Sequence, residues 1–110
     1  MIFVTGPLYA GKKTWVRKQL GLTEVELAAC AVWDVQNLVP VDDLKSLADE
    51  LAGRRVVIAT EIGGGVVPTD REERETRERA GRLSCLLAER ADAVVRVFCG
   101  IPTVIKGELP

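Results

Sequence analysis

Residues 1–14, MIFVTGPLYAGKKT, contain the pattern that decides the fold. Residues 1–5 form an apolar run with β-branched and aromatic side chains that stops at a glycine, as a buried strand does. Gly6, Gly11 and Lys12 then match the G-x-x-x-x-G-K phosphate-binding pattern, and a helical segment follows. We therefore predict a strand, a phosphate-binding loop and a helix in direct succession.

A loop of this kind binds an anion mainly through its backbone. Successive N–H groups curl around the phosphate, the helix N-terminus adds positive potential, and the lysine reaches the terminal phosphates. The other interpretation is a glycine-containing turn with an exposed lysine, which the strand–loop–helix context disfavours. The predicted nucleotide-binding residues are Gly6, Pro7, Leu8, Tyr9, Ala10, Gly11, Lys12, Lys13 and Thr14.

The loop departs from the usual pattern at Lys13, which stands where a serine or threonine hydroxyl normally binds Mg²⁺. Thr14 has a hydroxyl, but it lies one residue further on, about 100° around the helix. We therefore expect the loop to bind ATP or GTP, and Mg²⁺ binding to be weakened because its usual ligand is replaced by Lys13. The sequence predicts no metal site in the protein itself.

The rest of the chain alternates between strand and helix patterns. Thr23 and Glu26 have the spacing of a capping box, which predicts a short helix. Apolar runs predict strands at residues 30–35, 56–60, 93–99 and 102–106, and amphipathic patterns predict helices from Asp42–Asp43 to Gly53 and over residues 70–91. This order predicts a three-layer α/β fold with a mostly parallel sheet and helices on both faces. The length suits one domain over residues 1–110.

Composition excludes several classes of function. Fifteen basic and sixteen acidic residues give a net charge of −1, which indicates no nucleic-acid or membrane partner. The absence of histidine excludes imidazole bases, imidazole metal ligands and phosphorylated histidine. Cys30, Cys85 and Cys99 are predicted to be reduced, half-buried thiols. No signal peptide or long apolar span is present, so a cytoplasmic location is expected.

Two acids follow predicted strands, and strand ends face the ligand crevice in open α/β sheets. Asp34 ends one apolar run and is a candidate for holding metal-bound water or polarising a nucleophile; a solvated loop acid or helix cap is the alternative. Glu61 precedes a triple glycine that lets backbone approach a ligand, and a flexible turn is its alternative. With Lys12, these two are the candidate catalytic residues. Trp15 and Trp33 are interpreted as packing residues rather than stacking platforms.

The arginines of residues 70–82, DREERETRERAGR, allow two interpretations. One is a solvated helix face with ion pairs four residues apart. The other is contact with substrate phosphate, for which Arg77, Arg82 and the nearby Glu61 are the candidate substrate-binding residues.

Several blocks of the sequence resemble the bifunctional adenosylcobinamide kinase/adenosylcobinamide-phosphate guanylyltransferase family of cobalamin biosynthesis. They are VTG with GK near the start, TEIGGGVVP at residues 60–68, RETRERAGR at residues 74–82 and CGIPTVIK at residues 99–106. The positions that match the family pattern in order are Glu61, Gly63, Gly65, Val67, Pro68, Arg77, Glu78, Gly81, Gly100, Pro102 and Lys106. Asp34 and Asn37-Leu38 also match.

The resemblance implies a RecA-like P-loop NTPase fold, a trimer, and two reactions. Family members phosphorylate the aminopropanol hydroxyl of adenosylcobinamide with ATP or GTP, then carry GMP from GTP on a histidine to that phosphate. Here the segment that carries the histidine is much shorter, no histidine replaces it, Lys13 replaces the Mg²⁺ ligand, and Ser84-Cys85 replaces a polar pair.

These departures imply that guanylyl transfer is lost and that any remaining kinase activity is weakened. Two alternatives to the kinase stay open. One is a non-catalytic relative that binds nucleotide or corrinoid, or that partners a complete enzyme. The other is a small P-loop kinase for a different alcohol.

Overall fold

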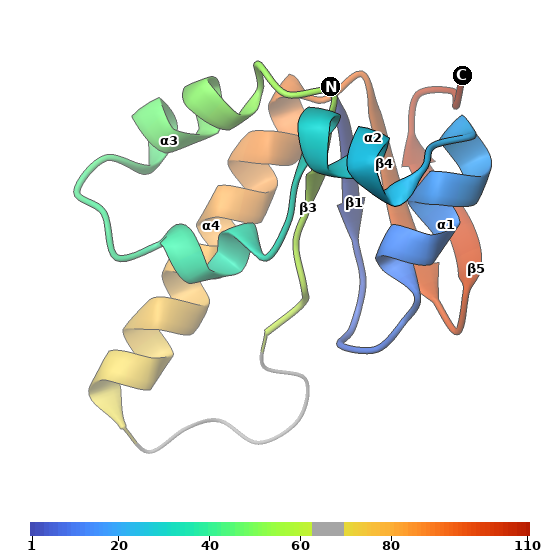
Figure 1. Ribbon diagram of the computed structural model, residues 1–110. Helices are drawn as coiled ribbons and strands as arrows, with labels where there is room; N and C mark the ends of the chain where they lie inside the picture. Colours follow the sequence, from blue (N-terminus) through green and yellow to red (C-terminus); the bar gives the residue numbers. More distant parts are fainter. Residues whose placement is uncertain (63–69) are drawn as a thin grey trace.

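The computed structural model describes residues 1–62 and 70–110, which form one five-stranded sheet flanked by helices (Figure 1). The elements are β1 (Ile2–Thr5), α1 (Lys12–Leu20), α2 (Glu24–Cys30), β2 (Ala31–Val32), the 3₁₀ helix η1 (Val35–Leu38), α3 (Leu44–Leu51), β3 (Val56–Ile58), α4 (Arg71–Arg90), β4 (Ala93–Phe98) and β5 (Ile101–Lys106). The strand order is β2-β3-β1-β4-β5, with parallel neighbours except for the antiparallel pair β4–β5. The predicted mostly parallel α/β sheet is confirmed.

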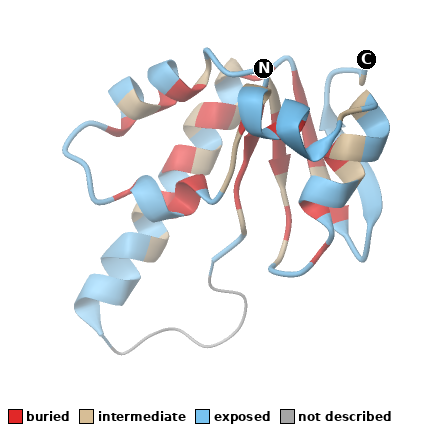
Figure 2. Cartoon of the chain, in the orientation of Figure 1, coloured by how far each residue is buried: buried red, intermediate tan, exposed pale blue. Residues whose placement is uncertain are grey.

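Helices cover both faces of the sheet, with α3 and α4 on one side and α1 and α2 on the other (Figure 1). Alternate strand residues face opposite sides, so Phe3 packs with α3 and α4 while its neighbour Val4 packs with α1 and α2. Buried positions concentrate on the strands and on the helix sides that face them (Figure 2). The two apolar layers fix the position of the carboxyl end of β1, where the predicted phosphate loop begins.

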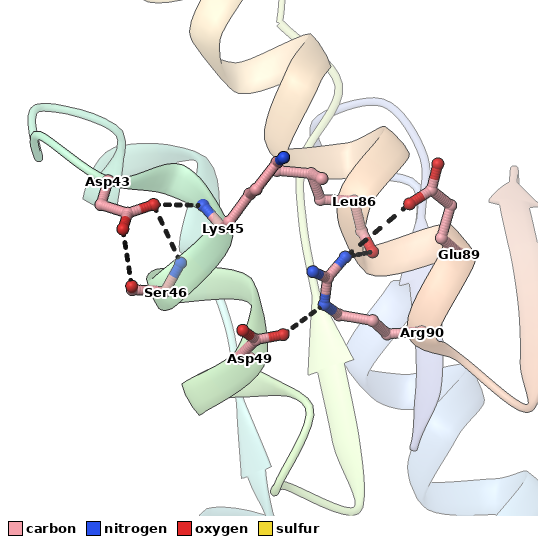
Figure 3. A network of polar contacts seen from close by, with 7 residues as sticks. All are labelled: Asp43, Lys45, Ser46, Asp49, Leu86, Glu89 and Arg90. Carbon is pink, nitrogen blue, oxygen red and sulfur yellow. Dashed lines mark hydrogen bonds and ion pairs between the residues drawn. The ribbon is translucent and has the colours of Figure 1, made fainter.

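Side-chain hydrogen bonds cap the starts of α2 and α3; the sequence predicts the capping box of α2 and the start of α3 at Asp42–Asp43. Thr23 Oγ1 accepts a hydrogen bond from the Glu26 N–H at 3.1 Å, and Glu26 Oε1 accepts one from the Thr23 N–H at 3.2 Å. Asp43 caps α3 by accepting hydrogen bonds from the N–H groups of Lys45 and Ser46 at 3.0 and 3.2 Å (Figure 3). Both caps satisfy N–H groups that have no partner inside their helix.

Arg90, near the end of α4, ties this helix to α3. Its Nε donates to Asp49 Oδ1 at 2.7 Å, and its Nη1 donates to the carbonyl oxygen of Leu86 at 3.0 Å (Figure 3). Arg79 makes a second connection, because it donates to the carbonyl oxygens of Val39 and Val41 after η1. The arginines therefore hold α3 and the segment before it against α4.

The strand in the run over residues 30–35 is shorter than predicted, and Asp34 takes the helix-cap position that was its alternative interpretation. β2 contains only two residues, Ala31 and Val32, and Asp34 has a left-handed backbone with φ 55°. Asp34 is the N-cap of η1, and aspartate tolerates this conformation better than most residues do. The chain therefore turns at Asp34 instead of continuing the strand, and Val35 is buried against α4 as part of η1.

Helix α4 has two distinct halves. Its N-terminal half is charged nearly all round and exposed, and its C-terminal half buries Ala80, Leu83 and Leu87, as the sequence predicts (Figure 2). Among the helices that the structure describes, none combines the length and the apolar character needed to cross a membrane.

The three cysteines are free thiols, as predicted, but only Cys30 is half-buried. The prediction of burial is wrong for Cys85 and Cys99, which are exposed. Cys85 lies on the side of α4 that faces a surface groove, and Cys99 lies in the turn between β4 and β5.

Candidate phosphate-binding site

The predicted phosphate loop, residues 6–12, connects the carboxyl end of β1 to the first turn of α1 (Figure 1). Both glycines have positive φ angles, 152° at Gly6 and 83° at Gly11, which side chains disfavour. Tyr9 also has a positive φ, 60°, and its side chain is 95% exposed. Gly11 is the N-cap of α1, so the helix begins directly at the loop. The loop thus presents the positive end of α1 to solvent at the carboxyl edge of the sheet.

Neighbouring elements hold the loop by backbone hydrogen bonds. The Glu61 N–H donates to the carbonyl oxygen of Gly6 at 2.9 Å, and the Gly100 N–H donates to that of Ala10 at 2.8 Å. Gly100 and Cys99 both have positive φ angles, 74° and 51°, as in a tight two-residue hairpin turn. The ends of β3 and β4 therefore fix the two ends of the loop.

Lys12 lies inside the loop instead of extending into solvent. Its Nζ donates to the carbonyl oxygens of Gly6 and Pro7 at 3.1 and 2.7 Å, and the residue is 8% exposed. Burial lowers the pKa of Lys12, while the charges of Asp34 and Glu61 act in the opposite direction. The ammonium group is thus close to the loop, where phosphate oxygens can replace the two carbonyl contacts.

The side chain of Lys13 points away from the loop carbonyls. Its Nζ lies 4.4 Å from the centroid of the Trp33 ring, a cation–π distance. Thr14 and Lys13 line a cavity of about 290 Å³ together with Arg17, Glu24, Leu27 and Trp33. The tryptophans Trp15 and Trp33 are partly buried and pack on the core, as predicted.

The residues at this position do not fit the usual Mg²⁺ site of such loops. Position 13 supplies an ammonium in place of a hydroxyl, and the Thr14 side chain lies on the cavity side of α1. Within residues 1–62 and 70–110, no group of three or more His, Cys, Asp and Glu side chains is placed to bind a metal ion.

The two predicted acids lie near Lys12, but in different environments. Glu61 accepts two hydrogen bonds from Arg96, Nε to Oε1 at 2.6 Å and Nη2 to Oε2 at 3.0 Å. These bonds lower the pKa of Glu61 despite its partial burial. Asp34 is exposed, and its Oδ1 accepts a hydrogen bond from Gln36 at 3.5 Å. The structure therefore brings Lys12, Asp34 and Glu61 together, with Glu61 already bound to a cation.

Arg96 and Gln36 are site residues that the sequence analysis missed. Gln36 is buried, and its Oε1 accepts a hydrogen bond from the Thr60 N–H at 2.9 Å, so it links the end of β3 to Asp34. Nothing in the local sequence distinguishes Gln36. Arg96 has a detectable signal, since it is the one charged residue in the otherwise apolar run over residues 93–99.

The two predicted substrate-binding arginines line separate surface hollows on α4. Arg82 pairs with Glu78 at 2.5 Å and lines a groove of about 740 Å³ with residues at the start of α3, among them Asp43 and Leu44. Arg77 lines a smaller hollow with Ile62, which directly follows Glu61. Arg77 is thus on the Glu61 side of α4 and Arg82 is toward α3. The predicted glycine-rich loop with Gly63, Gly65, Val67 and Pro68 lies outside the described residues.

Comparison with known families identifies the group to which this fold and site belong. The model of the family described as cobinamide kinase/cobinamide phosphate guanyltransferase matches residues 13–105. The chain belongs to this family. Its sheet and helices accordingly form a P-loop NTPase fold, and the resemblance stated from the sequence is confirmed. The phosphate loop up to Lys12 precedes the matched range, so its assignment rests on its own pattern and geometry.

One curated relative is the bifunctional adenosylcobalamin biosynthesis protein CobP of Pseudomonas aeruginosa. It is 32% identical to this chain over an alignment of length 101, and the alignment covers 78% of this chain. The alignment spans 58% of the CobP length.

Two of the positions that match the family have structural roles visible here. Lys106 donates from Nζ to the carbonyl oxygens of Ala88 and Glu89 at 3.0 and 3.1 Å, which satisfies acceptors at the end of α4. Gly100 supports the loop carbonyl of Ala10 as described above. Gly100 therefore stabilises the phosphate loop and Lys106 stabilises the end of α4, and these contacts explain both residues without a direct substrate role.

Proposed function

We propose that residues 1–110 form a single nucleotide-binding domain that binds ATP or GTP at the phosphate loop and transfers the terminal phosphoryl group to a side-chain hydroxyl of a corrinoid, with adenosylcobinamide as the acceptor. The observation that supports this most directly is the position of Lys12. Its ammonium lies among loop carbonyls at the start of α1, with Asp34 and Glu61 within electrostatic reach. Family membership supports the acceptor class.

In the proposed reaction, the hydroxyl oxygen of the acceptor attacks the γ-phosphorus and the bond from the γ-phosphorus to the β–γ bridging oxygen breaks. The nucleoside diphosphate leaves, and the hydroxyl proton passes to Asp34 or to solvent. Lys12 and the loop N–H groups stabilise the charge on the phosphate oxygens. Glu61 is a weak proton acceptor, because its hydrogen bonds to Arg96 lower its pKa.

Guanylyl transfer through a histidine is not part of the proposal, because these 110 residues contain no histidine. The alternative is a relative without catalytic activity that binds nucleotide or corrinoid, or that associates with a complete enzyme. The lysine at position 13, in place of the usual hydroxyl ligand of Mg²⁺, supports this alternative.

We also propose that the chain assembles with copies of itself, as the resemblance to a trimeric family implies. In the sheet formed by the described residues, β5 is an edge strand and all six of its residues are exposed. Its apolar side chains Ile101, Val104 and Ile105 are 67%, 47% and 61% exposed. An exposed apolar edge of this kind is suited to pairing with another chain. Light scattering after size-exclusion chromatography measures the mass, and a monomer at micromolar concentration contradicts this point.

Isothermal titration and a transfer assay test the main proposal. ATP or GTP is expected to bind the wild type, and Lys12→Ala is expected to weaken binding at least tenfold, a loss of about 1.4 kcal/mol. Lys18→Ala, an exposed lysine later in α1, is the matched control and is expected to retain affinity. Label from γ-labelled nucleotide appearing on adenosylcobinamide supports the kinase. Retained binding without turnover supports the non-catalytic alternative, and equal affinity in Lys12→Ala rejects the phosphate site.

A further inference from the structure

Arg96 lies directly beside the phosphate loop although it is far from the loop in sequence. It belongs to β4 and is the register partner of Thr5, the last residue of β1 before the loop. Its side chain is 43% exposed. Because β1 and β4 are parallel, both strands bring their carboxyl ends to the same edge of the sheet. A guanidinium group is therefore anchored in a rigid strand at the edge where the loop opens.

The orientation of Arg96 is fixed by Glu61. The two residues form a two-point hydrogen-bonded pair, at 2.6 and 3.0 Å, and the Glu61 N–H is itself bonded to the carbonyl oxygen of Gly6. The planar guanidinium matches pairs of oxygens on carboxylates and on phosphates. It carries five N–H groups, and the bonds to Glu61 use two of them. The N–H groups of Arg96 that Glu61 does not use are thus available to an anion that lies next to Gly6, the first residue of the loop.

A second cation near the outer phosphate stabilises the charge on the group that is transferred. Lys12 is within the loop, and the ammonium of Lys13 lies over Trp33. A nucleoside triphosphate carries more negative charge than a diphosphate, and this additional charge lies on the γ-phosphate. In phosphoryl transfer an arginine commonly stabilises that group. Among the described basic residues, Arg96 has the position and the donor geometry for it.

We propose that Arg96 is a ligand of the γ-phosphate and gives the site its preference for nucleoside triphosphates over diphosphates. This inference rests on the proposed nucleotide site and adds a residue from β4 to it. A diphosphate lacks the γ-phosphate, so the proposal confines the effect of Arg96 to the triphosphate.

The test compares the affinities of ATP and ADP, and of GTP and GDP, by isothermal titration. Arg96→Gln is expected to weaken triphosphate binding about tenfold and to leave diphosphate binding within about twofold. Arg96→Lys keeps the charge and loses the planar donor pair, so a smaller loss in the same direction is expected. Arg90→Gln removes an arginine that pairs with Asp49 between α3 and α4, and it is expected to change neither affinity.

Thermal denaturation shows whether each variant is folded. If Arg96→Gln is not folded, Arg96→Lys serves as the test. Equal losses for triphosphate and diphosphate overturn the inference, because they mean that Arg96 only supports the loop. Unchanged triphosphate affinity with reduced turnover also overturns it, in favour of a contact with the acceptor. Lys12→Ala separates the two proposals, since it is expected to weaken both nucleotides. Failure of the wild type to bind any nucleotide rejects both.

Discussion

Gly6 packs so closely against Val97 of β4 that a β-carbon at this position would lie 2.2 Å from the Val97 carbonyl oxygen. This contact joins the first residue of the phosphate loop to the neighbouring strand. The φ angle of Gly6, 152°, adds a conformational requirement for glycine. The glycine is therefore required by the packing of β4 against the loop as well as by the approach of a phosphate.

Gly6→Ala is predicted to destabilise the protein more than Gly21→Ala does. Gly21 also has a positive φ, 66°, but nothing lies within 4 Å of its β-carbon position. We expect conformational strain of about 1–2 kcal/mol in Gly21→Ala, and a further overpacking cost of about 1–3 kcal/mol in Gly6→Ala. Chemical denaturation of both variants measures the difference. Equal free energies of unfolding for the two variants would show that β4 can shift at Val97 at little energetic cost.

Lys13→Ser is predicted to make nucleotide binding more dependent on Mg²⁺. The substitution restores a hydroxyl at the position that usually binds the ion. We expect the ratio of ATP affinities with and without Mg²⁺ to rise about tenfold relative to wild type, measured by titration. Lys18→Ser, at an exposed position near the end of α1, is the control for loss of a positive charge.

The prediction for Lys13 fails under a specific condition. If the wild type binds ATP or GTP only when Mg²⁺ is present, the ion is held without a hydroxyl at this position. The contact of Lys13 with Trp33 then has a purely structural role.

The sequence predicts those parts of the site that depend only on residues close to one another along the chain. A strand that stops at Gly6, and a helix that starts at the next glycine and lysine, require only neighbouring residues. The capping box of Thr23 and Glu26 and the cap at Asp43 are local in the same way. Each depends on hydrogen bonds between residues at most three positions apart, so the linear pattern contains all the necessary information.

The parts that were not predicted depend on contacts between distant segments. Glu61 and Arg96 are 35 positions apart and meet because β3 and β4 both pair in parallel with β1, which brings their carboxyl ends to the same edge of the sheet. Lys13 meets Trp33 because α1 packs on the same side of the sheet as the chain following β2. The turn at Asp34 shortens β2, since burying Val35 against α4 requires the chain to leave the strand. The periodicity of apolar residues along the chain does not indicate which of these distant residues meet.

Glu61→Gln is predicted to lose less stability in acid than the wild type does: its free energy of unfolding falls by a smaller amount between neutral pH and acid. The folded state lowers the pKa of Glu61, so in acid the unfolded state binds more protons at this residue than the folded state. The stabilisation from the pair with Arg96 is present above the usual glutamate pKa of about 4.3 and is lost as the pH falls through the lower pKa of the folded state. A glutamine side chain at this position cannot titrate, so this pH-dependent loss is absent from the variant.

Denaturation curves between neutral pH and pH 3 test this linkage. The difference in free energy of unfolding between wild type and Glu61→Gln is expected to be largest at neutral pH and to shrink in acid. Glu50→Gln, which removes an exposed carboxylate from α3, is the control and is expected to show no such narrowing. A difference that stays constant with pH would contradict the role of the ion pair.

No stable GMP–enzyme is predicted to form when the protein is incubated with GTP. The resemblance to the family implies that GMP is carried on a histidine, and these 110 residues contain none. A lysine phosphoramidate is the remaining possibility, but an ammonium with a pKa of about 10.4 must first lose a proton. Lys12 has a lowered pKa, yet its Nζ donates hydrogen bonds to Gly6 and Pro7, which favours the charged ammonium.

Two further lysines, Lys106 and Lys13, are also poorly placed for this chemistry. Lys106 pairs in register with Val94 near the start of β4, at the opposite edge of the sheet from the phosphate loop, and it caps α4. The Nζ of Lys13 lies over the Trp33 ring and not among the carbonyl groups of the phosphate loop. Incubation with α-labelled GTP, followed by a denaturing gel and intact mass spectrometry, measures any covalent product. A species heavier by one GMP would contradict the prediction, and its position would identify the nucleophile.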